Sequence, residues 1–129
     1  MHENQIGESI IAAGIRVHRT LGPGLLESVY EAVLAYELKK RGFSVRRQVP
    51  VPIHYEELDF DEGFRADLIV NDCVIIELKS VAQLNRAHRK QIQTYLRLSH
   101  LRLGYLLNFG EELLRDGIVR AVNGLPDEA

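Results

Sequence analysis

Three charged side chains, Asp67, Glu77 and Lys79, surround one short apolar segment. Glu77 and Lys79 end the run Val74–Ile76, which has the composition of a buried strand. Burying a charge without a partner is costly, so two opposite charges at the end of a core strand need a reason. Carboxylates are hard oxygen ligands for Mg²⁺ or Mn²⁺, and a nearby lysine can orient or deprotonate water. The pattern predicts a metal-dependent active site; a surface salt bridge of Lys79 is an equally open alternative.

The loop between the two strands decides whether Asp67 and Glu77 can meet. A three-residue loop, Asn71–Cys73, places Asp67 directly opposite Glu77. A two-residue turn instead pairs Asp67 with Ile76 and separates the two carboxylates onto different faces. We therefore predict the three-residue loop, or a bulge with the same effect.

A further acidic side chain, Glu27, follows Gly24 at the start of a predicted helix. It lines up with Tyr30 and Leu34 at i+3 and i+7, the core-facing side of that helix. An acid at this position suggests a third metal ligand directed at the sheet. With Gly24 as the N-cap, however, Glu27 is the third helical residue, where a carboxylate satisfies free backbone N–H groups. The sequence leaves both interpretations open.

A polar stripe on a later predicted helix consists of His88, Gln91 and Tyr95 at i, i+3 and i+7. Such a stripe could line a cleft beside the carboxylates and hold substrate phosphates or orient Lys79. Basic side chains accompany it at Arg86, Arg89 and Lys90. They fit a solvated helix face equally well as a path for phosphates.

Periodicity and turn signals predict the elements that position these residues. Helices are expected over 7–20, 25–41 and 84–99, and strands over 43–49, 51–55, 64–70, 74–79, 101–109 and 117–122. An acidic loop is expected at 56–62, a helical turn at 111–115 and a frayed tail at 123–129. Pro50 and Pro52 confine the region 43–55 to a sheet edge or bend. The core order α-α-β-β-β-β-α-β predicts an α/β fold, a central mixed sheet flanked by helices.

Composition narrows the classes of protein. The 129 residues predict a single domain over 1–129, with an ordered core at about 8–122. The net charge of −2 argues against a protein that coats nucleic acid nonspecifically, but not against an enzyme that meets nucleic acid at one local patch. The single cysteine, Cys73, excludes an intramolecular disulfide and fits the reducing cytoplasm. We expect neither a signal peptide nor a membrane span.

Several segments together carry a family resemblance. The stretch VHRTLGPGLLESVYEAVLAYEL resembles the GxxExxY family, whose signature corresponds to Gly24, Glu27 and Tyr30. The resemblance continues through FRADLIV, VIIELKS, HRKQIQTYL and LGYLLNFG, so it extends over roughly residues 8–122. The ordered set is far more specific than any one of its pieces.

The GxxExxY family looks like a compact branch of the PD-(D/E)XK nuclease superfamily, and this likeness implies a restriction-endonuclease-like core. That core has a helix, three antiparallel strands, a helix and a further strand. The resemblance also implies roles: Glu27 matches the acid of the first core helix, Asp67 the motif aspartate, and Glu77 with Lys79 the ExK element. A last match, to the QxxxY element of exonuclease-like branches, is formed by Gln91 and Tyr95.

These observations favour a divalent-metal-dependent nuclease that hydrolyses DNA or RNA. Glu27, Asp67 and Glu77 would hold Mg²⁺ or Mn²⁺, and Lys79 would activate water. His88 and the adjacent basic residues would guide the backbone. Two alternatives remain: a non-catalytic module that binds nucleic acid or assembles with protein, and an enzyme that hydrolyses a smaller phosphate ester. A homodimer would supply recognition surface that so short a chain lacks.

Overall fold

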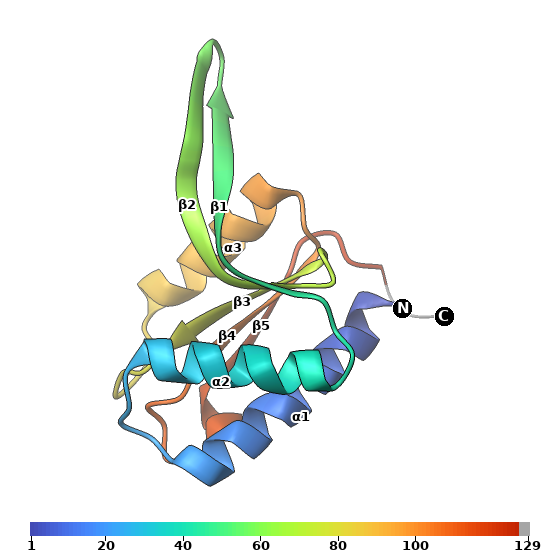
Figure 1. The fold of residues 1–129 in the computed structure, drawn as a ribbon. Helices are drawn as coiled ribbons and strands as arrows, with labels where there is room; N and C mark the ends of the chain where they lie inside the picture. Colours follow the sequence, from blue (N-terminus) through green and yellow to red (C-terminus); the bar gives the residue numbers. More distant parts are fainter. Residues whose placement is uncertain (127–129) are drawn as a thin grey trace.

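A computed structural model describes residues 1–126 of the chain. Three helices, five strands and a short 3-10 helix follow one another (Figure 1): α1 Glu3–Leu21, α2 Glu27–Lys40, β1 Val45–Tyr55, β2 Leu58–Val70, β3 Val74–Lys79, α3 Arg86–Ser99, β4 Leu103–Asn108, η1 Leu114–Gly117 and β5 Ile118–Val122.

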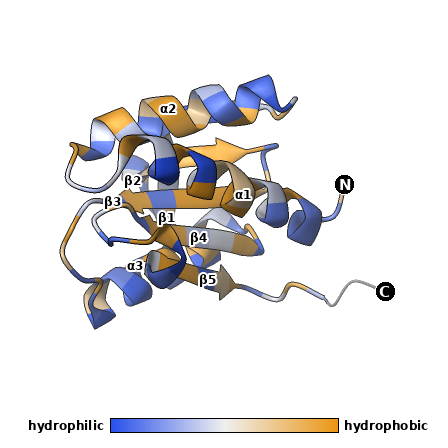
Figure 2. Cartoon of the chain, turned by 90° about the horizontal axis from the view of Figure 1, so that it is seen from below, coloured by the Kyte–Doolittle hydropathy of each residue, from blue (hydrophilic) through white to orange (hydrophobic). Residues whose placement is uncertain are grey.

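The five strands form one mixed sheet in the order β1-β2-β3-β4-β5. Neighbouring strands are antiparallel except β3 and β4, which are parallel and are joined through α3. Figure 2 shows the layers: α1 and α2 cover one face of the sheet, and α3 covers the other. This arrangement confirms the predicted fold class, a central mixed sheet flanked by helices.

Each face of the sheet carries its own apolar cluster. The larger cluster lies under α1 and α2 and includes Ile10, Leu34, Ile76 and Leu107. The smaller one lies under α3 and includes Ile75, Ile92 and Leu96. The central strands β3 and β4 are buried along almost their whole length, as a parallel pair covered on both faces requires. Charged residues at the ends of these strands are therefore held on a rigid support.

The end of α2 agrees with the sequence prediction, whereas the start of α1 does not. Gly42, with φ of 96°, follows α2 as its sequence predicted. Helix α1 begins earlier than predicted because His2 and Gln5 cap it reciprocally: the Asn4 backbone N–H donates to His2 Nδ1, and the His2 N–H donates to Gln5. Histidine is not among the residues that usually signal an N-cap, so this start could not be recognised from residue types.

The region 43–62 differs most from the prediction. The expected strands 43–49 and 51–55 are one strand, β1, so the observed order is α-α-β-β-β-α-β-β. The expected acidic loop 56–62 is only a turn at 56–57, because β2 already starts at Leu58. Pro50 and Pro52 do lie on an edge strand, as predicted. The ends of β1 and β2 away from the sheet project from the body as a two-stranded arm (Figure 1).

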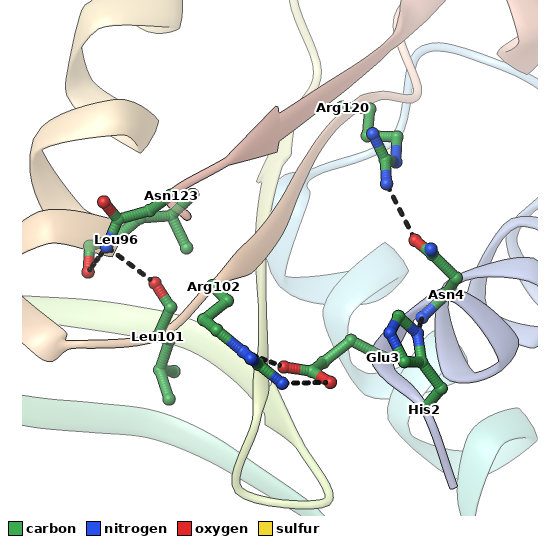
Figure 3. Close-up of polar contacts among 8 residues, drawn as sticks. All are labelled: His2, Glu3, Asn4, Leu96, Leu101, Arg102, Arg120 and Asn123. Carbon is green, nitrogen blue, oxygen red and sulfur yellow. Dashed lines mark hydrogen bonds and ion pairs between the residues drawn. The ribbon is translucent and has the colours of Figure 1, made fainter. Parts of the chain in front are cut away.

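The chain after β5 is not frayed at its start, contrary to the prediction. Figure 3 shows that the Asn123 side chain donates to the carbonyls of Leu96 and Leu101, at 3.5 and 3.1 Å. Leu125 also packs against the larger core cluster. Residues 127–129 lie outside the described part of the chain, so the single domain over 1–129 stays a prediction. No helix within residues 1–126 has the length and apolarity needed to cross a membrane.

Candidate active site

The candidate site lies where β2 and β3 separate. Regular pairing ends at Leu68 opposite Ile76, after the three-residue loop that the sequence predicted. Beyond this pair, the two carboxylates accept the hydrogen bonds that backbone carbonyls would accept in a regular sheet. The Asp67 N–H donates to Glu77 Oε1 at 3.2 Å, and the Leu78 N–H donates to Asp67 Oδ2 at 2.8 Å. Asp67 and Glu77 are thus brought together, each binding the backbone of the opposite strand.

The electrostatics of Glu77 are unusual. The residue is only 5% exposed, and no cationic side chain within residues 1–126 forms an ion pair with it. Burial and, after it, the negative charge of Asp67 raise the pKa of Glu77 to about 9, although Lys79 opposes this shift. Two adjacent carboxylates with so little neutralisation are typical of functional sites rather than of structural ion pairs.

Lys79 is half-buried at the end of β3, and its amine makes neither an ion pair nor a hydrogen bond with the described residues. The chain after it is held firmly. Ser80 Oγ donates to the Leu25 carbonyl at 2.7 Å. The buried Asn108 side chain accepts from the Val81 N–H and donates to the Val81 carbonyl, at 3.0 and 2.9 Å. The strand end is therefore fixed while the lysine amine stays available.

Tyr30 fixes the loop that leads into α2. It is fully buried and stacks on Phe109, with ring centroids 4.5 Å apart. Its hydroxyl donates to the Gly22 carbonyl at 2.5 Å and accepts from the Leu25 N–H at 3.1 Å. Together with the bond from Ser80, these contacts hold the start of α2 against the end of β3.

Glu27 is exposed and opens α2 as its first residue. The N-cap is Leu26 and not Gly24, so the alternative interpretation, in which Gly24 caps the helix and Glu27 is its third residue, is wrong. Glu27 and Asp67 instead line one cavity of about 270 Å³, together with Ser28, Glu31, Gln48 and Leu78. The carboxylate of α2 thus shares a cavity with the carboxylate of β2, to which Glu77 is joined through the Asp67 backbone.

Sequence reasoning missed two residues of this cavity, Glu31 and Gln48. Glu31 is 6% exposed, forms an ion pair with Arg47 at 3.0 Å and accepts a hydrogen bond from the Gln48 amide. The same Gln48 nitrogen lies 3.3 Å from Asp67 Oδ1. The only available signal for Glu31 was its spacing of four residues from Glu27, and Gln48 had none.

Comparison with known proteins decides the family. A family model described as the PD-(D/E)XK nuclease superfamily matches residues 4–121. The chain belongs to this superfamily. No curated protein and no solved structure matches it significantly. The narrower likeness to the GxxExxY family remains a resemblance.

The stripe expected on α3 is only partly beside the PD-(D/E)XK carboxylates. Tyr95 stacks on Phe64, with centroids 3.9 Å apart. Burial, and then the charges of Glu77 and Asp67, raise the pKa of Tyr95. Gln91 is exposed and makes no side-chain hydrogen bond with the described residues.

The N-terminal part of this stripe has a structural contact. His88 Nδ1 accepts from the Asn85 N–H at 3.2 Å and completes the cap of α3, whereas a nucleic-acid contact was predicted. The neighbouring basic side chains are exposed and form no ion pair within residues 1–126: Arg86, Arg89 and Lys90.

The donor set suits a hard divalent ion. Nucleases of the PD-(D/E)XK superfamily generally use divalent metals. No group of three or more His, Cys, Asp and Glu side chains in the described chain is arranged to hold one. Mg²⁺, however, is usually bound by one or two carboxylates and completes its octahedron with water and substrate phosphates. Asp67 and Glu77 meet that requirement, and a cation there would offset the repulsion between them.

Proposed function

We propose that this protein is a divalent-metal-dependent nuclease that hydrolyses phosphodiester bonds in DNA or RNA. One observation carries the proposal: Asp67 and Glu77 each hydrogen-bond the backbone of the other's strand where β2 and β3 separate. Lys79, two residues after Glu77, has no side-chain partner among residues 1–126. Membership of the PD-(D/E)XK superfamily supports the class of reaction. The substrate and the metal requirement belong to the proposal.

The carboxylates would hold the cofactor, Mg²⁺ or Mn²⁺. Asp67 and Glu77 would bind it directly, and Glu27 would contribute from across the shared cavity. When bound, such an ion supplies charge stabilisation for the phosphate and a water of lowered pKa. The loss of one proton from Glu77 would accompany binding, because a carboxylate must be ionised to act as a ligand.

The remaining residues would position the reactants. Lys79 is half-buried and has no partner in the described chain, so its amine can orient the attacking water or stabilise charge on the phosphate. Tyr95, stacked on Phe64, has a fixed ring and would orient the lysine or the phosphate. Gln91 lies one turn before Tyr95 on the same side of α3 and would assist it.

The nucleic-acid backbone would follow the exposed basic side chains at the start of α3. Arg86, Arg89 and Lys90 lie in its first two turns and have no acidic partner among the described residues. His88 would act there only if its capping bond opened. The surface offered by one chain is small, so a homodimer is part of the proposal, to be measured by sedimentation.

The decisive experiment incubates the purified protein with linear, circular and single-stranded DNA and with RNA, in Mg²⁺, Mn²⁺ or EDTA. Lys79→Met, which keeps the apolar stem but removes the amine, should abolish metal-dependent products. Lys39→Met, at an exposed lysine on α2, is the matched control and should cleave like the wild type.

A non-catalytic binding module is the other candidate. The capping role of His88 and the lack of side-chain bonds from Gln91 to the described residues favour it, because these residues then need no catalytic role. Binding of nucleic acid without products under every metal condition would support the module and reject the nuclease. Turnover of a small phosphate ester, insensitive to loss of Arg86, Arg89 and Lys90, would instead indicate a phosphoesterase.

A further inference from the structure

Both carboxylate oxygens of Asp67 have a hydrogen-bond partner. Oδ2 accepts from the backbone N–H of Leu78 at 2.8 Å, and Oδ1 lies 3.3 Å from the amide nitrogen of Gln48. Each carboxylate oxygen has a second lone pair, so these bonds fix the orientation of the group and leave capacity for a cation. The backbone partner belongs to the sheet itself; among residues 1–126, Gln48 supplies the side-chain amide that donates to the Asp67 carboxylate.

Gln48 reaches Asp67 through an irregularity in β1. Residues on either side of it pair regularly with β2, Arg47 with Leu68 and Val49 with Ala66, which puts Gln48 directly across from Asp67. Gln48 itself is missing from this pairing and has φ of 50°, the left-handed region that glutamine rarely adopts. Strain of this kind persists only where surrounding contacts enforce it, and it is concentrated at functional sites.

Glu31 supplies one of those contacts. Its buried carboxylate accepts from the Gln48 amide through Oε1 and from Arg47 through Oε2. The Glu31 charge is matched by Arg47, while Gln48 is a neutral donor between two acids. A neutral donor orients Asp67 without neutralising it, whereas a lysine or arginine in this place would compete with a metal ion for the same charge.

We propose that Gln48, anchored by Glu31, is a positioning residue that holds Asp67 in the orientation that binds a divalent cation. The inference rests on the proposed function, since it assigns a partner to one of its metal ligands. Gln48 touches neither substrate nor cation in this role; it acts through Asp67. Partners of this kind that hold metal ligands typically change metal affinity or activity by about 10–100-fold when they are removed.

The test measures Mn²⁺ binding by calorimetry, without substrate, for the wild type, Gln48→Met and Gln48→Gly. Methionine keeps the length and removes the donor. Glycine removes the donor and suits the left-handed backbone, so it should fold even where methionine does not. Both should weaken Mn²⁺ binding by about 10-fold or more. The control, Gln93→Met, removes an amide that donates to the Val122 carbonyl away from the site, and should bind like the wild type.

Cleavage provides the second readout. Both Gln48 variants should need about 10-fold more Mn²⁺ for half-maximal rate and regain much of the rate when Mn²⁺ is saturating. Wild-type affinity in the folded Gln48→Gly variant would overturn the inference and leave the proposed function intact. Failure of the wild type to bind Mn²⁺ at all would overturn the proposed function together with the inference. Weak binding by Gln93→Met as well would mean a general loss of structure and would also count against the role of Gln48.

Discussion

Two buried carboxylates at opposite ends of the sheet have opposite surroundings. Glu3, 9% exposed, receives two hydrogen bonds from the Arg102 guanidinium, at 2.7 and 3.1 Å (Figure 3). Its hydrogen bond with Arg102 holds the pKa of Glu3 below its ordinary value. Glu77 is buried at least as deeply but has no cationic partner among the described residues; burial and then the charge of Asp67 raise its pKa to about 9.

The difference separates a structural acid from a functional one. Glu3 has a cation with matching bidentate geometry and ties α1 to the start of β4. Glu77 is buried beside Asp67, an arrangement that disfavours its ionised form and so weakens the metal-free fold at neutral pH. Such an arrangement is useful where a cation is to be bound. Replacing Glu77 and replacing Glu3 should therefore have different, measurable effects.

The largest expected effect is on catalysis. Glu77→Gln should lower metal-dependent cleavage by ~10²-fold or more, the scale seen when a group that stabilises transition-state charge is lost. Glu3→Gln should leave the rate per folded molecule unchanged, because Glu3 lies at the other end of the sheet. Single-turnover rates on the cleaved substrate measure both. Equal losses in the two variants would erase the distinction between the two acids.

Glu77→Gln should also stabilise the metal-free protein. The folded pKa of about 9 exceeds the ordinary value of 4.5, so the folded state holds a proton that the unfolded state releases. Stability from this group is complete below pH 4.5 and falls as the pH rises toward 9. At pH 7.5 the loss is on the order of 4 kcal/mol, at about 1.4 kcal/mol per pH unit.

Urea unfolding in EDTA between pH 5 and 9 checks this prediction. The wild type should lose stability across that window, and Glu77→Gln should lose much less. Adding Mn²⁺ should restore the wild type and leave the variant unchanged. Parallel pH profiles for the two proteins would show that Glu77 is ionised in the metal-free fold.

Glu3→Gln should have a smaller effect of opposite sign. The lowered pKa of Glu3 means that its ionised form stabilises the fold above pH 4.5, and that this stability is lost as the pH falls through the folded pKa. The variant should therefore melt a few degrees lower at neutral pH and converge with the wild type in acid. Thermal melts at pH 7 and pH 3 measure the difference; a constant gap at both would mean that packing, not charge, is responsible.

The smallest expected effect belongs to Tyr95→Phe. The substitution keeps the stack on Phe64 and removes only the hydroxyl. Stability should stay unchanged, while cleavage should fall about 10-fold if the hydroxyl orients the lysine or phosphate. Unchanged cleavage would reduce Tyr95 to a packing residue.

The part of the site that could be predicted from sequence depends on local register. Asp67 and Glu77 are joined by a three-residue loop, so counting from Asn71–Cys73 was sufficient to set them opposite each other. Their residue types then indicated the chemistry. The buried strands β3 and β4 were predicted closely because continuous apolar runs leave little choice.

Gln48 could not be predicted in this way. Counting back from the turn at 56–57, where Tyr55 pairs with Leu58, sets Gln48 opposite Arg65. A register shift between Val51 and Ile53 moves it two residues, to Asp67. Next to this shift Gly63 packs closely against Ile53, a cross-strand contact that alternation along one strand does not encode. Glu31 was missed for a related reason, since its role in the site is to accept a hydrogen bond from Gln48, whose position could not be predicted.

The projecting arm of β1 and β2 is acidic, whereas the rest of the chain has a net positive charge. Residues 53–63 carry five acidic side chains and no lysine or arginine, so the rest of the chain has a net charge of +3 against −2 for the whole. Salt screens charges beyond about 8 Å, so the arm acts only on what passes close to it. A polyanion would therefore be turned away along the length of the arm, and the protected stretch left by a bound strand in footprinting would end where β1 and β2 leave the sheet.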